Sequence, residues 1–162
     1  MFDAIGDLPL HPLVVHAVVI GIPLTLLLAV LFAVPRFRSA ARWPLGVVAV
    51  GSAVASMVAR LSGASLKQAL GIVPGNPVGD LISQHAQLAT QLVWIMVVVA
   101  VLAVLTVLLV SRRPETTMVD RVLPLVLIVA ALVATIWVAR TGDIGSRAAW
   151  NPTGDTVYTT GR

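Results

Sequence analysis

Four long runs of apolar residues, separated by short polar breaks, dominate the pattern of the chain. They cover about 12–34, 44–61, 81–110 and 122–139. Each run is near or above the roughly 20 residues that a helix needs to cross the hydrocarbon core of a bilayer. The pattern therefore predicts an all-α fold, an integral membrane four-helix bundle that forms a single transmembrane domain over residues 1–162.

The polar breaks predict the connections between these helices. The first break is short and basic, with Arg36, Arg38 and Arg42. The segment 62–83 holds the turn-forming run Pro74-Gly75-Asn76-Pro77, and we expect either a plain loop there or one or two helical turns at the membrane interface. The tail 140–162 is polar and rich in glycine, and we expect it to be irregular.

The second run has the composition of a packing helix. It is rich in small residues, and three of them recur at four-residue spacing, Gly51, Ala55 and Ala59. This spacing lets membrane helices approach closely. The stripe therefore favours tight contact within the bundle, and it is also compatible with a partner helix or a homodimer.

Composition agrees with a membrane protein and argues against nucleic acid as a partner. The chain is 58% hydrophobic and 11% charged, whereas soluble domains are about a quarter charged. Its pI is about 11.1, but the basic residues are scattered at the ends of the apolar runs. Arginine is concentrated after the first and third runs, which places both termini on the exterior or periplasmic side of a bacterial inner (cytoplasmic) membrane.

The absence of cysteine narrows the chemistry of any site. The chain has 162 residues and no cysteine, which excludes disulfides, iron-sulfur clusters and covalently attached haem. A bound metal or haem would need His, Met or oxygen ligands. The sequence shows no phosphate loop, nucleophile triad or paired carboxylates, so it does not support a hydrolase. Enzymatic activity stays an open question, and an electron-transfer component of a membrane oxidoreductase is the form it would take.

The three histidines all belong to the predicted exterior half. His11 and His16 open the first run, and His85 opens the third. Since these two helices run in the same direction, His16 and His85 are expected at similar depth, facing each other across the bundle. An ionisable residue inside a membrane span is a functional-site hypothesis by default.

Cations are expected in the same layer. Arg60 and Arg140 end the second and fourth runs, and Arg147 follows in the tail. A b-type haem needs imidazole ligands and cations for its propionates, which His16, His85 and these arginines would supply. Plain structural roles stay open: Arg60 and Arg140 can reach out to headgroups and cap their helices, and each imidazole can bond to a neighbouring backbone group.

The opening of the chain resembles a known family. Residues 8–16 read Leu8-Pro9-Leu10-His11-Pro12-Leu13-Val14-Val15-His16, which is similar to the signature of the bacterial membrane proteins called domain of unknown function 2231. Four spans, a His opening the third and a glycine-punctuated tail fit the same family. The layout is also similar to that of small membrane cytochromes b. The chain departs from the family at Ala17-Val18, where relatives often have Phe-Pro, and at Asp143, where many have His.

Three functional hypotheses follow. The first is a membrane-embedded b-type haem protein that transfers single electrons at the exterior face to a redox partner protein. The second is a copper or zinc site built from His11, His16 and His85, with Asp143 as a further ligand. The third is a structural or assembly subunit without a cofactor.

Overall fold

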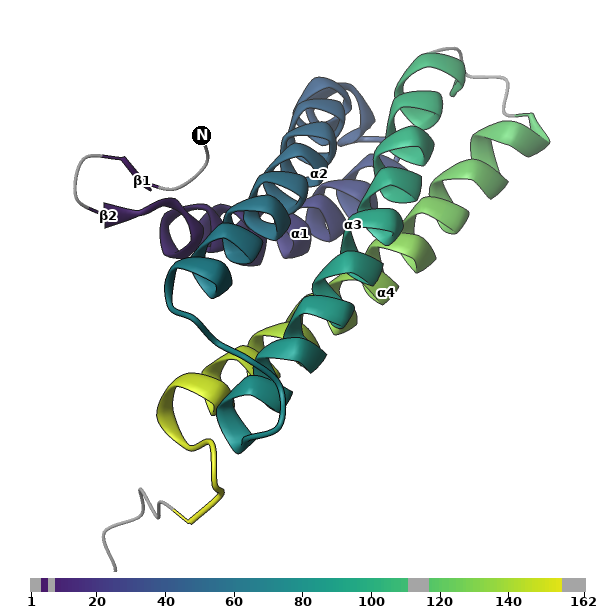
Figure 1. The fold of residues 1–162 in the computed structure, drawn as a ribbon. Coiled ribbons are helices and arrows are strands. Elements are labelled where there is room, and N and C mark those ends of the chain that lie inside the picture. The colour runs from purple at the N-terminus through teal and green to yellow at the C-terminus, as the bar shows by residue number, and fades with distance from the viewer. Residues whose placement is uncertain (1–3, 6–7, 111–116, 156–162) are drawn as a thin grey trace, which may run out of the picture.

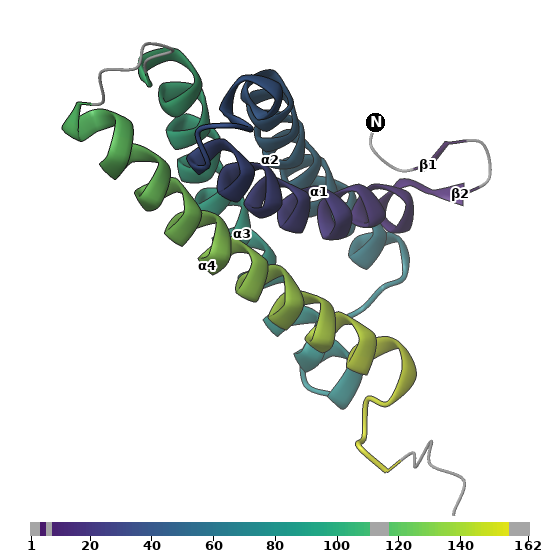
Figure 2. The same cartoon turned by 180° about the vertical axis from the view of Figure 1, so that it is seen from behind.

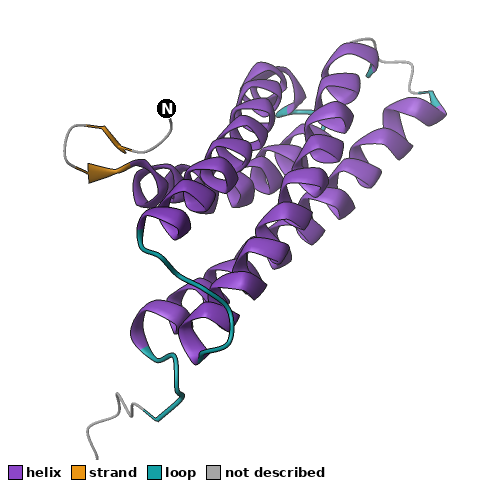
Figure 3. Cartoon of the chain, in the orientation of Figure 1, coloured by secondary structure: helices purple, strands orange, loops and turns teal. Residues whose placement is uncertain are grey.

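The structure is a computed structural model that describes residues 4–5, 8–110 and 117–155. Four long helices make up almost all of the described chain (Figure 1): α1 (Leu10–Ala33), α2 (Arg38–Ala69), α3 (Pro77–Leu109) and α4 (Met118–Trp150). Ahead of them, two strands of two residues each pair antiparallel (Figure 3): β1 (Ala4–Ile5) and β2 (Leu8–Pro9).

The helices pack in a ring, in which α1 contacts α2 and α4 while α3 contacts the same two helices. Consecutive helices run up and down as two hairpins, α1/α2 and α3/α4, which the front and rear views both show (Figures 1 and 2). All four are long and apolar enough to cross a membrane. The predicted all-α membrane bundle is therefore confirmed.

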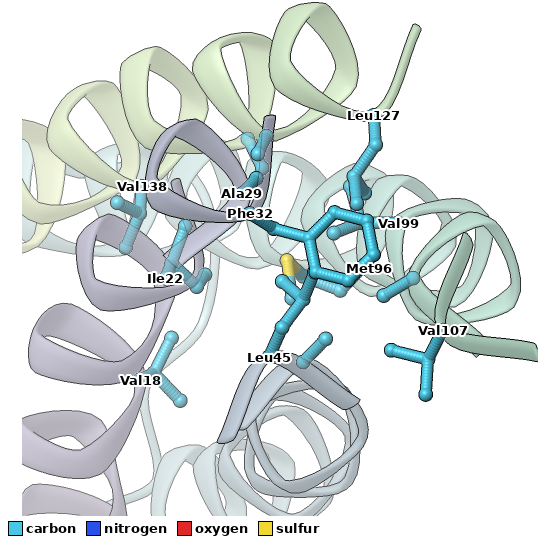
Figure 4. Packing of buried hydrophobic residues seen from close by; sticks show 14 of the residues in the cluster. Val18, Ile22, Ala29, Phe32, Leu45, Met96, Val99, Val107, Leu127 and Val138 are labelled. Carbon is cyan, nitrogen blue, oxygen red and sulfur yellow. The ribbon is translucent and has the colours of Figure 1, made fainter. Parts of the chain in front are cut away.

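Each helix buries one seam of residues at alternating steps of four and three. The seams are Val18, Ile22, Thr25, Ala29 and Phe32 in α1; Leu45, Ala49, Ser52, Ser56 and Ala59 in α2; Leu92, Met96, Val99, Ala103 and Thr106 in α3; and Pro124, Leu127, Ala131, Ala134, Val138 and Thr141 in α4. This spacing keeps one face of a helix against its neighbours in a left-handed bundle. Large side chains from the seams meet in the centre (Figure 4).

The outer faces of the helices remain apolar. Ile20 in α1, Trp94 in α3 and Leu125 in α4 are at least 60% exposed. Large exposed apolar surfaces mark contact with another apolar phase, and on four helices of spanning length this phase is lipid. The bundle is therefore a multi-pass membrane protein in contact with the bilayer, and the membrane side of its termini stays a prediction.

The second and fourth helices are longer than the apolar runs predict. α2 continues to Ala69, so the first part of the segment 62–83, where we expected a loop or interfacial turns, belongs to a helix of the bundle. The tail predicted to be irregular from residue 140 is helical as far as Trp150. Gly142 and Gly145 lie inside this helix. Helix propensity is a weak signal that packing overrides, and the end of α4 packs on the start of α3.

Two boundaries have clear local causes. Asn76 caps α3 by accepting a hydrogen bond from the backbone of Gly79 at 2.9 Å, and Pro77 supplies the first helical residue.

At the other boundary, α2 begins at Arg38, so Arg42 lies within a helix rather than in the basic loop that we expected. Arg42 is only 8% exposed and donates to the carbonyl of Val110 at 3.1 Å.

We call the end of the bundle where α1 and α3 begin the histidine end, and the other end the Arg42 end. The α1/α2 and α3/α4 hairpins diverge toward the histidine end (Figure 1, left of the view).

Candidate metal or haem site at the histidine end

The buried seams extend to two histidines. His11 precedes Val18 by seven residues (18 − 11 = 7), and His85 precedes Leu92 by seven (92 − 85 = 7), so each occupies the inward position of its helix. Their rings lie next to each other, with centroids 6.3 Å apart and planes at 90°. The structure thus pairs His11, from α1, with His85, from α3.

Each ring is held by a backbone carbonyl of the neighbouring helix in its own hairpin. Nδ1 of His11 lies 2.8 Å from the carbonyl oxygen of Ala59, and Nδ1 of His85 lies 2.9 Å from that of Thr141. A carbonyl oxygen only accepts hydrogen bonds, so Nδ1 must carry the proton in both rings. In the neutral form, Nε2 of each ring then presents a lone pair, which is the state that binds a metal.

A partly open cavity of about 60 Å³ lies at this pair and is lined by all four helices. Its walls are mainly apolar or small, with Val15, Val18, Val19, Ala59, Ala89, Leu92, Val138 and Gly142 beside the two histidines. The two hydroxyl groups in the lining are used within their own helices. Ser56 donates to the carbonyl of Ser52 and Thr141 to that of Trp137, both at 2.8 Å.

His16 is not part of this cavity, so the prediction that His16 faces His85 is wrong. Its side chain is exposed, and its Nδ1 lies 2.7 Å from the carbonyl of Pro12, one turn back in α1. The five residues from His11 to His16 rotate the side chain well off the inner seam at about 100° per residue. Counting back in sevens reaches His11 and His85 only from Val18 and Leu92, whose inward position the packing of the helices reveals.

The predicted cations lie on the outside of the same layer. The Nε of Arg60 donates to the hydroxyl of Thr90 on α3 at 2.7 Å. Arg140 is exposed, and its guanidinium carbon lies 5.4 Å from the centre of the Trp137 ring. Arg147 is exposed near the end of α4. Arg60 and Arg140 are next in sequence to Ala59 and Thr141, whose carbonyls hold the imidazoles, but neither arginine lines the cavity.

A metal site with three histidines is not assembled in the described structure. Residues 4–5, 8–110 and 117–155 contain no group of three or more His, Asp or Glu side chains placed to hold a metal ion. Asp143 and His16 are both exposed, away from the paired rings. The protein ligands that the cavity offers are therefore two imidazoles.

Comparison with known proteins decides the family. The family described as a predicted membrane protein (DUF2231) matches residues 7–157, nearly the whole chain. The chain belongs to this family. No curated protein and no solved structure matches the chain. The DUF2231 match includes all four helices and both residues of the histidine pair, and it agrees with the membrane architecture. Its description names no activity, and the likeness in layout to small membrane cytochromes b stays a prediction.

Proposed function

We propose that this DUF2231 protein binds b-type haem through His11 and His85 and transfers single electrons at the histidine end of the membrane. The observation that carries the proposal is the geometry of the ring pair. The rings of His11 and His85 lie side by side, with centroids 6.3 Å apart, and each Nδ1 is held by a backbone carbonyl. The Nε2 atoms of these two residues would therefore be the ligands that hold the iron.

The surroundings of the pair supply what the protein must contribute to such a centre. Both Nδ1 atoms are bonded to backbone carbonyls, which orients the rings and increases the basicity of the ligating nitrogens. The lining is mainly apolar, which lowers the local dielectric. Arg60 and Arg140, each next in sequence to a residue whose carbonyl holds an imidazole, would supply the cations for the propionates. Haem supplies the one-electron redox chemistry.

The space at the pair sets a condition on the proposal. A cavity of about 60 Å³ admits a metal ion and little more, so a porphyrin requires the α1/α2 and α3/α4 hairpins to separate further at this end. Two features favour such an opening: the hairpins already diverge here, and small residues such as Ala59, Ala89 and Gly142 line the cavity.

Optical spectra of purified protein test the proposal. The full chain, expressed with haem supplied and purified in mild detergent, should show a Soret band and an α band that appears on reduction. The variants His11→Ala and His85→Ala should lose the reducible α band, and the matched control His16→Ala should keep it. A wild-type protein that folds but shows no Soret band would refute haem binding.

A bare copper ion is the second candidate, and the small volume of the cavity favours it. Imidazole is a suitable ligand for copper. Protein zinc sites usually have three or four protein ligands, whereas this cavity offers two, so copper fits better than zinc. Anaerobic loading with Cu(I), followed by metal analysis, should give one copper per chain in the wild type and in His16→Ala, and none in His11→Ala. Wild-type protein that retains no copper would exclude this candidate.

The same preparation also tests a structural role. If the wild type is colourless and metal-free after both loadings, and the His11→Ala/His85→Ala double variant folds as stably as the wild type, the pair only closes hydrogen bonds. The protein would then act as a structural or assembly subunit.

A further inference from the structure

Each histidine of the pair lies against a glycine of the neighbouring helix. A methyl group added at Gly63 of α2 would lie 2.9 Å from Cε1 and 3.0 Å from Nδ1 of His11. One added at Gly145 of α4 would lie 2.9 Å from Nδ1 and 3.0 Å from Cε1 of His85. Carbon atoms do not approach this closely without displacement, so any larger residue at either glycine would push the ring away.

The position of these glycines relative to the carbonyl acceptors is the same in both hairpins. Gly63 follows Ala59 by four residues (63 − 59 = 4), and Gly145 follows Thr141 by four (145 − 141 = 4). A helical side chain leans toward the N-terminus and covers the turn before it. Glycine at this position therefore leaves the carbonyl one turn earlier accessible from the side.

An accessible helical carbonyl has a second lone pair to offer. The carbonyls of Ala59 and Thr141 lie inside α2 and α4, where each is positioned to accept the backbone N–H four residues later. A carbonyl oxygen has two lone pairs, so besides the backbone N–H it can accept from Nδ1 of the imidazole. The Ala59 carbonyl also accepts from the hydroxyl of Ser62 at 3.2 Å. The local sequences around the two carbonyls differ, so the arrangement recurs without a sequence repeat.

We propose that Gly63 and Gly145 are paired positioning residues, each of which seats one imidazole on a helix carbonyl and so builds one half of a two-ligand site. Each hairpin carries a complete half-site, made of a histidine, a carbonyl and a glycine. A ligand held by both histidines would tie the two hairpins together. The seating of the rings does not depend on the proposed function. The binding of a ligand by the seated rings, which we call the ligand step, rests on the proposed function.

Seating is tested on cofactor-free protein by NMR of ¹⁵N-labelled histidine. Gly63→Ala should shift or abolish the hydrogen-bonded Nδ1–H signal of His11 and leave that of His85, and Gly145→Ala should do the reverse. Gly51→Ala is the matched control in α2, because an added methyl there meets open space, and it should leave both signals in place. If Gly63→Ala and Gly145→Ala leave both signals unchanged, the proposal is wrong.

Thermal unfolding of a double-variant series provides a second measurement. Alanine is a better helix former than glycine, so Gly63→Ala should destabilise the protein only when the His11 ring is present to be displaced. In a His11→Ala background the same substitution should be neutral or stabilising. Equal destabilisation in both backgrounds would show that Gly63 does not act through His11.

The ligand step is tested by titrating haem, or Cu(I), into the same variants. Loss of groups that orient a metal-ligating histidine lowers affinity by about 10–100-fold. We expect a loss in this range for Gly63→Ala and for Gly145→Ala, with Gly51→Ala unchanged. Unchanged affinity in both glycine variants would refute the ligand step. The wild type could also bind neither probe and still show both hydrogen-bonded Nδ1–H signals. That result would refute the proposed function and support the seating of the imidazoles.

Discussion

The two ends of the bundle differ in how completely side chains fill the space between the helices. Toward the Arg42 end, large residues fill the space between the helices, and Phe32 and Leu45 are fully buried there (Figure 4). At the histidine end, two imidazoles and small residues such as Ser56 and Ala59 lie beside Val18, Leu92 and Val138, and a cavity of about 60 Å³ remains. The same repeat of inward positions therefore yields a packed core at one end and a cavity beside two imidazoles at the other.

Polar groups at the two ends also differ in what they are used for. Arg42 donates to the carbonyl of Val110, which ends α3, so a buried charge secures a helix terminus. His11 and His85 donate to the carbonyls of Ala59 and Thr141. These carbonyls lie inside α2 and α4, where the backbone N–H four residues later already supplies a hydrogen bond. We therefore expect substitutions at the Arg42 end to change the free energy of unfolding, and those at the histidine end to change ligand uptake.

The largest expected effect on stability is that of Phe32→Ala. Removing a fully buried ring leaves a cavity, and since lipid is itself apolar the cost comes from lost packing, at about 3 kcal/mol. Unfolding in mixed detergent micelles measures it, with Trp94→Ala, an aromatic 67% exposed, as the control. Ligand uptake by the folded fraction should be unchanged. Equal stability of Phe32→Ala and the wild type would contradict a packed Arg42 end.

Arg42→Ala should have the next largest effect. It removes a buried donor and leaves the Val110 carbonyl without that hydrogen bond, at a cost of about 1–3 kcal/mol. Arg36→Ala is the matched control, because Arg36 is exposed and lies over the Phe37 ring. The same unfolding measurement applies. A loss no greater than that of Arg36→Ala would mean that the hydrogen bond contributes little.

Leucine in place of a small residue at each end should have different effects at the two ends. Ala103 is fully buried in the packed seam, so Ala103→Leu should destabilise the protein by at least about 1 kcal/mol. Ala89 lines the cavity, and Ala89→Leu should fill it, with a smaller change in stability and at least a tenfold loss of haem or copper affinity. Unfolding and titration measure the two effects. Full uptake by Ala89→Leu would place the ligand elsewhere.

His16→Ala should have the smallest effect. The side chain is exposed and bonds only to a carbonyl of its own helix, so stability should change by less than about 0.5 kcal/mol. Uptake of haem or copper should match the wild type in the same titration. A loss of uptake as large as that of His11→Ala would return His16 to the ligand set.

The prediction of the fold and of the site from the sequence succeeded to different degrees. The four apolar runs gave the number of helices, since length and hydropathy are local properties of the chain. They failed at the ends of α2 and α4, where polar residues and glycines continue a helix that packing stabilises. At the site, the sequence predicts His85 and His16 as the facing pair and His11 only as a ligand of a copper or zinc site, whereas His85 pairs with His11 and His16 is exposed.

The sequence by itself determined a membrane protein of four helices with histidines at one end, because burial in lipid requires long apolar helices whatever their packing. Only the tertiary structure decided which histidines meet. One residue turns a helical side chain by about 100°, so the choice between His11 and His16 depends on the register of the buried seams. The glycines that seat the two rings act through close approach between helices, and such an approach is a property of the assembled bundle.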